Sequence, residues 1–162
     1  MTPKMLALKE TLQSDWPIGK NCGAVKTGQK KKRNEAVKML FSIAAGGAIG
    51  ATLRYLVMSG VGNVVGLAFP WGTMAVNVVG SFVLGALVET MALVWSPGAE
   101  LRAFLVVGIL GAFTTFSTFS LDVVTLYERG AFMEAGFYVI ASMVVSIAAL
   151  FAGLAIARGV IG

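Results

Sequence analysis

The chain has 162 residues, of which 57% are hydrophobic and 13% are charged. A soluble domain carries about twice this share of charged residues, so the composition, with a mean hydropathy of +0.81, excludes an ordinary soluble globular protein. The chain has no histidine and a single cysteine, Cys22. An intrachain disulfide is therefore excluded, and the side chain that most often serves as a metal ligand and neutral-pH acid or base is missing.

Residues 1–38 form a basic segment that differs from the rest of the chain. They hold nine of the thirteen Lys and Arg residues, whereas residues 39–162 carry four cations and five anions. Charge runs of this kind are usually solvated, and beside a membrane they can touch anionic lipid. We expect either a disordered basic arm or a start-site artefact, with the natural chain beginning at Met39.

Four apolar stretches follow, each about as long as the 20 residues that a helix needs to cross a bilayer. The sequence predicts spans at residues 39–59, 72–95, 102–127 and 132–157, joined by short linkers that make neighbouring helices antiparallel. Trp71 and Trp95 bracket the second span, where aromatic rings settle at the membrane interface. The expected fold is a single all-α membrane domain, residues 39–162. Small residues at helix-packing spacing, such as Gly46 and Gly50, favour an oligomer, most simply a dimer.

Polar residues recur along one face of the second span and one face of the fourth. A spacing of four residues keeps them on the same side of a helix. One interpretation is hydrogen-bonded packing between helices, and the other is a hydrated path through the protein. Together with the third span, the stripes favour the path. They comprise Thr73, Asn77, Ser81, Gly85 and Glu89 in the second span, and Tyr138, Ser142 and Ser146 in the fourth.

The third span contains the segment GAFTTFSTFS, residues 111–120, in which six of ten residues are Gly, Ser or Thr. Gly108 and Gly111 each weaken a helix by roughly 1 kcal/mol, and Ser and Thr can bond the backbone groups that a break exposes. We expect the third helix to be broken mid-membrane, within residues 111–118. The freed carbonyl groups would suit a hard cation. The positive ring edges of Phe116 and Phe119 could solvate an anion.

Neutral hydrogen-bond donors complete the expected anion path. They are the amide of Asn77 and the hydroxyls of Ser117, Thr118, Tyr138 and Ser146. Because no Lys or Arg belongs to this set, an anion would be bound weakly enough to leave again. Arg54, toward the end of the first span, would raise the anion concentration at a mouth of the path.

Three segments resemble the fluoride channel family, known as Fluc or CrcB-like. They are GGAIGATLRY at 46–55, GTMAVNVVGSFVLG at 72–85 and GILGAFTTFSTFSLD at 108–122, and the resemblance extends over residues 39–160. It implies an antiparallel, dual-topology homodimer in a bacterial inner membrane. Such a dimer would export fluoride passively through two pathways along the subunit interface and so reduce fluoride toxicity.

The resemblance also implies roles for individual residues. Phe116 and Phe119 would line the pores, and Asn77 would be the pore asparagine. The backbone carbonyls of Gly111 and Thr114 would hold a structural Na+ at the dimer interface, which is the one cofactor implied. Asp122 stands where an acidic residue follows the phenylalanine box. The remaining polar lining would be Tyr138, Ser117, Thr118, Ser142 and Ser146, with Arg54 in a vestibule.

An antiparallel pair needs both orientations of the chain, and the basic segment opposes this. From Met39 onward the bias of Lys and Arg between the two sides is slight, but the nine preceding cations should hold the N-terminus inside. Either residues 1–38 precede the natural start, which is the interpretation we favour from the sequence, or they fix one orientation. In the second case the partner would be an oppositely oriented paralogue.

Two other functions remain open at this point. A small dual-topology multidrug or cation exporter would need a buried carboxylate within its path, but Glu89 lies near the end of the second span and the first span has no acid. A membrane assembly subunit would use its small-residue faces to bind another protein. We expect no enzyme, because no nucleophile–base pair or cofactor motif is visible. The expected partners are fluoride, a second chain and membrane lipid, and no nucleic acid.

Overall fold

A computed structural model describes the backbone of residues 18–161, and the side chains of residue 30 and residues 32–161. The chain divides into two units that meet between Lys38 and Met39, and each is considered by itself. Residues 18–38 belong to helix α2, Ile18–Val65. The part of the basic segment before residue 18 lies outside the described residues.

Six further helical elements follow α2, and with it they form four apolar segments. Helix α3 is Trp71–Leu93 and α7 is Phe132–Ile161. Between them lie α4 (Ala99–Arg102), the π-helix η1 (Ala103–Leu110), α5 (Gly111–Phe113) and α6 (Phe116–Glu128). Among the described residues, four segments are long and apolar enough to cross a membrane: Lys32–Val65, Trp71–Leu93, Ala99–Glu128 and Phe132–Ile161. The prediction of an all-α protein with four membrane spans is confirmed.

Glycine and proline mark the ends of these segments. Gly66 follows α2 with φ of +91°, and its amide donates to the Gly62 carbonyl. Pro70 precedes α3, where its missing N–H costs nothing because the first amides of a helix have no partner. After α6, Gly130 has φ of +77° and donates to the Tyr127 carbonyl. A positive φ is the usual helix stop because glycine adopts it without steric cost.

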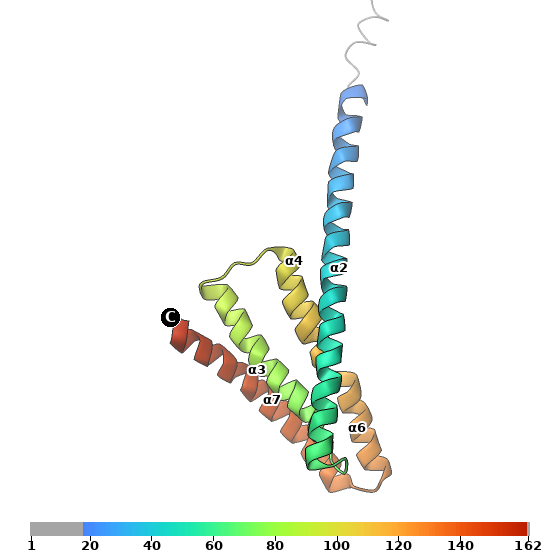
Figure 1. Cartoon of the computed structure of the whole chain (residues 1–162), viewed down its shortest axis with the longest axis vertical. Coiled ribbons are helices and arrows are strands. Elements are labelled where there is room, and N and C mark those ends of the chain that lie inside the picture. Colours follow the sequence, from blue (N-terminus) through green and yellow to red (C-terminus); the bar gives the residue numbers. More distant parts are fainter. Residues whose placement is uncertain (1–17, 162) are drawn as a thin grey trace, which may run out of the picture. The chain divides into compact units, whose positions relative to one another are not determined.

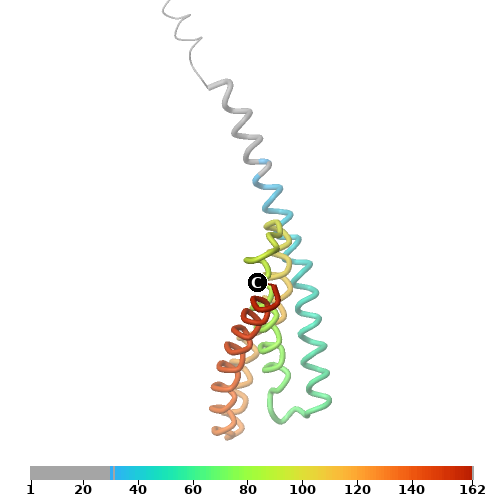
Figure 2. The backbone as a smooth tube through the Cα atoms, turned by 90° about the vertical axis from the view of Figure 1, so that its left-hand side faces the viewer, coloured from blue at the N-terminus to red at the C-terminus, as the bar shows by residue number. Residues whose placement is uncertain are grey.

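Helices α3 and α7 pack against each other far more extensively than α3 packs against α5 or α6. Figures 1 and 2 show them running side by side in the same direction, with the C-terminal ends of both at the same end. A Cβ on Gly85 would overlap the backbone of α7 at Leu150, and a Cβ on Gly153 would overlap the backbone of α3 at Phe82. The two backbones therefore touch directly, as small residues allow in membrane helices.

An ion pair joins the same two helices near their C-terminal ends. The Nε of Arg158 donates to the Glu89 Oε1 at 2.8 Å. Glu89 is buried, whereas the side chain of Arg158 is mostly exposed. The carboxylate that ends the polar stripe of the second span is thus paired with a cation.

The first span contacts the third through a second glycine seam. Gly46 and Gly108 face each other so closely that a Cβ on either would lie about 3 Å from the other's Cα, at 3.0 and 2.9 Å. One turn further, Gly50 lies against the backbone of Ile109. Gly108, noted in the sequence as a helix-weakening residue, is therefore also a packing residue.

The buried core is small and lies between α6 and α7. Tyr138 is fully buried and packs with Phe119, Leu126 and Ala135. Large apolar side chains elsewhere point outward, including Phe41, Leu56, Ile140 and Phe151. Together with the four apolar helices, this outward apolar surface fits a multi-pass protein that is surrounded by lipid.

Candidate functional site

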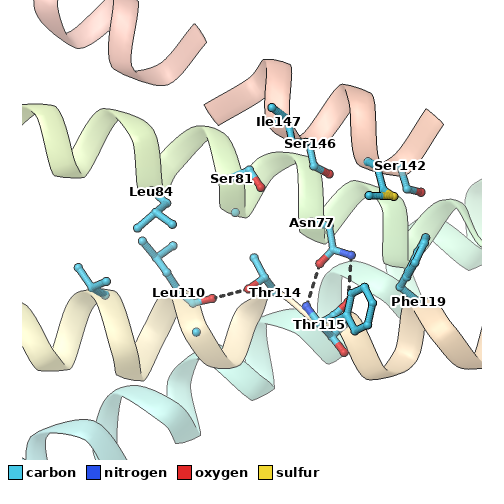
Figure 3. A pocket seen from close by; sticks show the side chains of 15 residues that line it. Asn77, Ser81, Leu84, Leu110, Thr114, Thr115, Phe119, Ser142, Ser146 and Ile147 are labelled. Atoms are coloured by element: carbon cyan, nitrogen blue, oxygen red, sulfur yellow. Dashed lines mark hydrogen bonds between the residues drawn. The ribbon is translucent and has the colours of Figure 1, made fainter. Parts of the chain in front are cut away.

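One groove collects most of the predicted site residues. It lies among α3, η1, α5, α6 and α7, and its volume is about 420 Å³ (Figure 3). Among the described residues, the fifteen that line it include no charged side chain. The predicted residues that line the groove are Asn77, Gly111, Thr114, Phe116, Phe119, Ser142 and Ser146.

The floor of this groove is an interruption in the helical path of the third span. Helix α5 ends at Phe113, and the backbone is extended at Thr114 (ψ 157°) and at Thr115 (φ −152°, ψ 123°) before α6 begins at Phe116. Thr114 closes α5, because both its amide and its Oγ1 donate to the Leu110 carbonyl, at 3.1 and 3.0 Å. The extended pair lies inside the segment in which the sequence predicted a break.

Asn77 of α3 holds the extended pair in place. The Thr115 amide donates to the Asn77 Oδ1 at 2.8 Å, and the Asn77 Nδ2 donates to the Thr115 carbonyl at 3.0 Å. The two bonds run in opposite directions, so the backbone itself fixes which atom of the amide is oxygen and which is nitrogen. Figure 3 shows the amide facing Thr115 across the groove. One Nδ2 hydrogen is left for another acceptor.

The two hydrogen bonds between Asn77 and Thr115 form a clamp. With the clamp and the Thr115 cap in place, two backbone amides no longer donate to the carbonyls that they would bond in a continuous helix. In a continuous α-helix the Thr115 amide would donate to the Gly111 carbonyl, and the Thr118 amide would donate to the Thr114 carbonyl. Here the first amide donates to Asn77 and the second donates to the Thr115 Oγ1 at 3.1 Å. The carbonyls of Gly111 and Thr114, which the sequence singled out as cation ligands, are therefore among those that lose their helical partners at the interruption. Their oxygens are hard donors that suit a small hard cation.

Thr115 is the N-cap of α6. Its Oγ1 accepts from the Thr118 amide, donates to the Thr118 Oγ1 at 3.0 Å, and lies 3.3 Å from the Ser117 Oγ. The hydroxyls of Ser117 and Thr118 therefore meet at the helix start, and neither residue lines the groove. Threonine is a preferred N-cap because its oxygen satisfies an amide that lacks a helical partner.

Aromatic rings form a row that begins in the groove and continues into the core. The ring centroids of Phe116 and Phe119 lie 5.5 Å apart, and Phe119 is 5.2 Å from Tyr138. Tyr138 in turn meets the ring of Phe69 edge-on at 5.5 Å. Phe119 is buried, but Phe116 is 77% exposed in the single chain. The row is therefore buried at its Tyr138 end and exposed at its Phe116 end.

Two hydroxyls of α7 lie above this floor. The Oγ atoms of Ser142 and Ser146 are buried, and neither has a hydrogen-bond partner among the described residues. Figure 3 shows both side chains directed toward the groove beside α3. Because a buried hydroxyl without a partner costs free energy, these two hydroxyls are available to donate to a polar group in the groove.

Two more of the predicted residues do not line the groove. Tyr138 is behind Phe119, and its hydroxyl donates to the Asp122 Oδ2 at 3.1 Å. Arg54 is half-buried on α2 and is not among the lining residues. The fully buried tyrosine therefore supports the ring of Phe119 from the core side.

Sequence reasoning missed Thr115, and it read Gly80 as a helix-packing residue without placing it at the groove. Thr115 is buried and makes the contacts that organise the interruption. Its signal was a threonine at the position where an N-cap should precede a helix. Gly80 packs so closely against Thr114 and Phe113 that a Cβ there would overlap the Thr114 methyl group. No signal within one helix could have revealed that contact.

The comparisons with known proteins agree with this architecture. The family described as CrcB-like protein, Camphor Resistance (CrcB), matches residues 41–154. The "Fluoride-specific ion channel FluC" of Rhodospirillum centenum is 57% identical over 122 residues, which is 75% of this chain and 97% of the relative. The protein of the same name from Agrobacterium fabrum is 58% identical over 116 residues, covering 72% of this chain and 93% of the relative.

A third relative of the same name, from Chelativorans sp., is 53% identical over 122 residues, which is 75% of this chain and 98% of the relative. These matches span nearly the whole length of each relative, and the family model reaches from the first membrane segment into the fourth. The resemblance inferred from the three motifs is confirmed, and this chain belongs to the CrcB-like family.

Proposed function

We propose that this chain is a fluoride-selective channel that lets fluoride leave the cell passively and so reduces fluoride toxicity. Relatives more than 50% identical carry the name "Fluoride-specific ion channel FluC". The observation that carries the proposal is the groove, whose polar lining is uncharged and is placed beside two phenylalanine rings.

The groove chemistry suits a small anion that must lose its water. The unpaired hydroxyls of Ser142 and Ser146 and the remaining Nδ2 hydrogen of Asn77 are neutral donors. The edges of Phe116 and Phe119 add positive electrostatic potential without a fixed charge. Donors of this kind replace hydration, while the lack of a cation among the lining residues keeps binding weak enough for release.

The other predicted residues act around this path. Ser117 and Thr118 present hydroxyls at the start of α6, next to Phe116. Tyr138 contributes the buried face behind Phe119. Arg54 lies in a vestibule, where its charge concentrates anions. The interruption at Thr114–Thr115 lies near the middle of the membrane, because it divides a segment of membrane-spanning length, Ala99–Glu128.

A second chain in the opposite orientation completes the channel. The uncovered ring of Phe116 and the open groove beside it are suited to burial against a partner. An antiparallel pair would repeat the groove twice along one interface. The partner is a second copy of this chain or an oppositely oriented paralogue, and the pair lies in a bacterial inner membrane. The work done is passive conduction, so the protein is not an enzyme.

A structural Na+ fits the carbonyls of Gly111 and Thr114. Both have lost the amide that a continuous helix would supply, so both can turn toward a cation. Bound there, Na+ would supply a positive charge that ties two interrupted helices together at the dimer interface. A dimer that forms and conducts equally well in Na+-free medium would contradict this assignment.

Fluoride efflux from liposomes that contain the purified protein tests the function. The substitutions Phe116→Ile and Phe119→Ile should each slow efflux strongly, because an aliphatic side chain of similar bulk has no positive ring edge. Chloride efflux should stay low throughout. Unaltered fluoride efflux in both variants would remove the pore assignment.

The same assay separates the alternatives. A proton-coupled exporter predicts that Glu89→Gln abolishes transport and that transport needs a proton gradient. The pairing of Glu89 with Arg158, away from the groove, favours a structural role for this carboxylate instead. An assembly subunit predicts that the purified protein conducts no ion at all.

A further inference from the structure

A second groove lies where the second membrane segment ends and the third begins. It lies among the C-terminal part of α3, the 94–98 linker, α4 and η1, and its volume is about 720 Å³. Figure 1 shows the linker that joins this end of α3 to α4. Helix α3 packs only lightly against η1, whereas it packs extensively against α7. A volume of this size falls in the range of roughly 300–1,000 Å³ that small-molecule sites occupy.

Arg102 is the one charged residue among those that line the second groove. It is exposed, and within the part of the chain that the structure describes it forms no ion pair. Glu100 does not line the groove, and side chains two residues apart on a helix do not face each other. Glu89, on α3, is already bonded to Arg158. The groove therefore presents an uncompensated positive charge beside an apolar surface.

This cation lies at the depth of lipid head groups. Helix α3 ends at Leu93 and the third membrane segment begins at Ala99, so the linker between them marks one edge of the membrane. Trp95 lies in this linker, and tryptophan rings favour the membrane interface. Arg102 belongs to the first turn of the third segment, and Val106 lies one turn deeper, at the level of acyl chains.

We propose that the second groove binds one anionic phospholipid, with the lipid phosphate on Arg102 and an acyl chain along the apolar lining. That lining includes Val88 and Val107, which are 45% and 55% exposed in the single chain. Basic pockets between membrane helices bind anionic head groups. A second protein chain packed here would have to supply its own carboxylate to Arg102, because burying one unpaired charge is costly. A phospholipid supplies both the anion and the apolar chain. The proposal does not depend on which ion the protein conducts.

A tryptophan placed at the rim of the second groove reports the lipid beside it. In the full chain with Trp16, Trp71 and Trp95 replaced by Phe, Val107→Trp puts the reporter in the groove lining, and Phe151→Trp puts the control on an exposed site of α7. Bilayers contain equal amounts of phosphatidylglycerol and phosphatidylcholine, with bromine on the acyl chains of one or the other, because bromine quenches tryptophan on contact. The groove reporter should favour phosphatidylglycerol about fivefold, and the control should show no preference.

Substitutions at the cation decide the cause. Arg102→Gln should remove the preference at the groove reporter, whereas Arg102→Lys keeps the charge and should keep it, which separates lost charge from lost folding. Equal quenching by both lipids in the chain that retains Arg102 would overturn the proposal, as would a preference that survives Arg102→Gln. A groove reporter that neither lipid quenches would also overturn it, because protein would then cover the groove.

Discussion

Replacing Asn77 with Leu should disrupt the interruption in the third span while preserving side-chain bulk. The change removes both hydrogen bonds to Thr115, at 2.8 and 3.0 Å, and leaves a buried amide and a buried carbonyl without partners. Each such group costs about 1–3 kcal/mol, so the combined loss is about 2–6 kcal/mol. Since 1.4 kcal/mol is a factor of ten, the intact geometry becomes at least about tenfold less populated relative to alternatives.

Fluoride efflux and the unfolding temperature of the purified protein measure this effect together. Efflux should fall by about tenfold or more, unfolding should occur at a lower temperature, and the Thr115 amide should exchange its hydrogen faster. Thr90→Ala on the same helix is the control, because its hydroxyl only bonds a carbonyl of its own helix, at 2.8 Å from Ala86. If Asn77→Leu abolishes efflux without changing stability or exchange, Asn77 acts as a direct donor and the clamp reasoning is refuted.

Three further substitutions test the surroundings of the groove. Gly80→Ala should slow efflux, because the new methyl group would push Thr114 out of position, whereas Gly136→Ala, with nothing within 4 Å, should leave efflux unchanged. Gly153→Ala should destabilise the protein by several kcal/mol in thermal unfolding, since backbone rather than a flexible side chain must yield; wild-type unfolding of this variant would disprove direct backbone contact between α3 and α7. Glu89→Gln should lower the unfolding temperature slightly by removing the ion pair and should leave efflux near wild type, so lost efflux with a folded protein would restore the exporter hypothesis.

The four spans could be predicted because they rest on local sequence signals. Apolar stretches of bilayer length fix the spans. Gly111 and the run of hydroxyl residues after it mark a helix that cannot continue unaided. The sequence could not show which side chain would bond the backbone amide and carbonyl of Thr115 at the interruption. That partner, Asn77, lies 38 residues away on another helix, and the sequence favoured a place for it in the anion path over hydrogen-bonded packing between helices.

Other features depended on contacts that local patterns do not contain. The π-helix at Ala103–Leu110 was not predicted, because its apolar residues read as an ordinary α-helix. Tyr138 was placed in the polar path from its stripe, yet it is fully buried behind Phe119 and bonded to Asp122. The four-residue spacing of Tyr138, Ser142 and Ser146 placed them on one face of α7. How far each side chain is buried depends on packing against α6, which the spacing does not show.

The reciprocal glycines of α3 and α7 have a consequence for gating. Gly85 packs against the backbone of α7, and Gly153 packs against the backbone of α3. Neither helix can therefore slide or rotate against the other without breaking these backbone contacts. These two helices therefore form a rigid wall of constant shape, closed at one end by the Glu89–Arg158 ion pair. A change in the width of the groove would therefore have to come from the elements that face this wall, among them the two extended residues that Asn77 holds through Thr115.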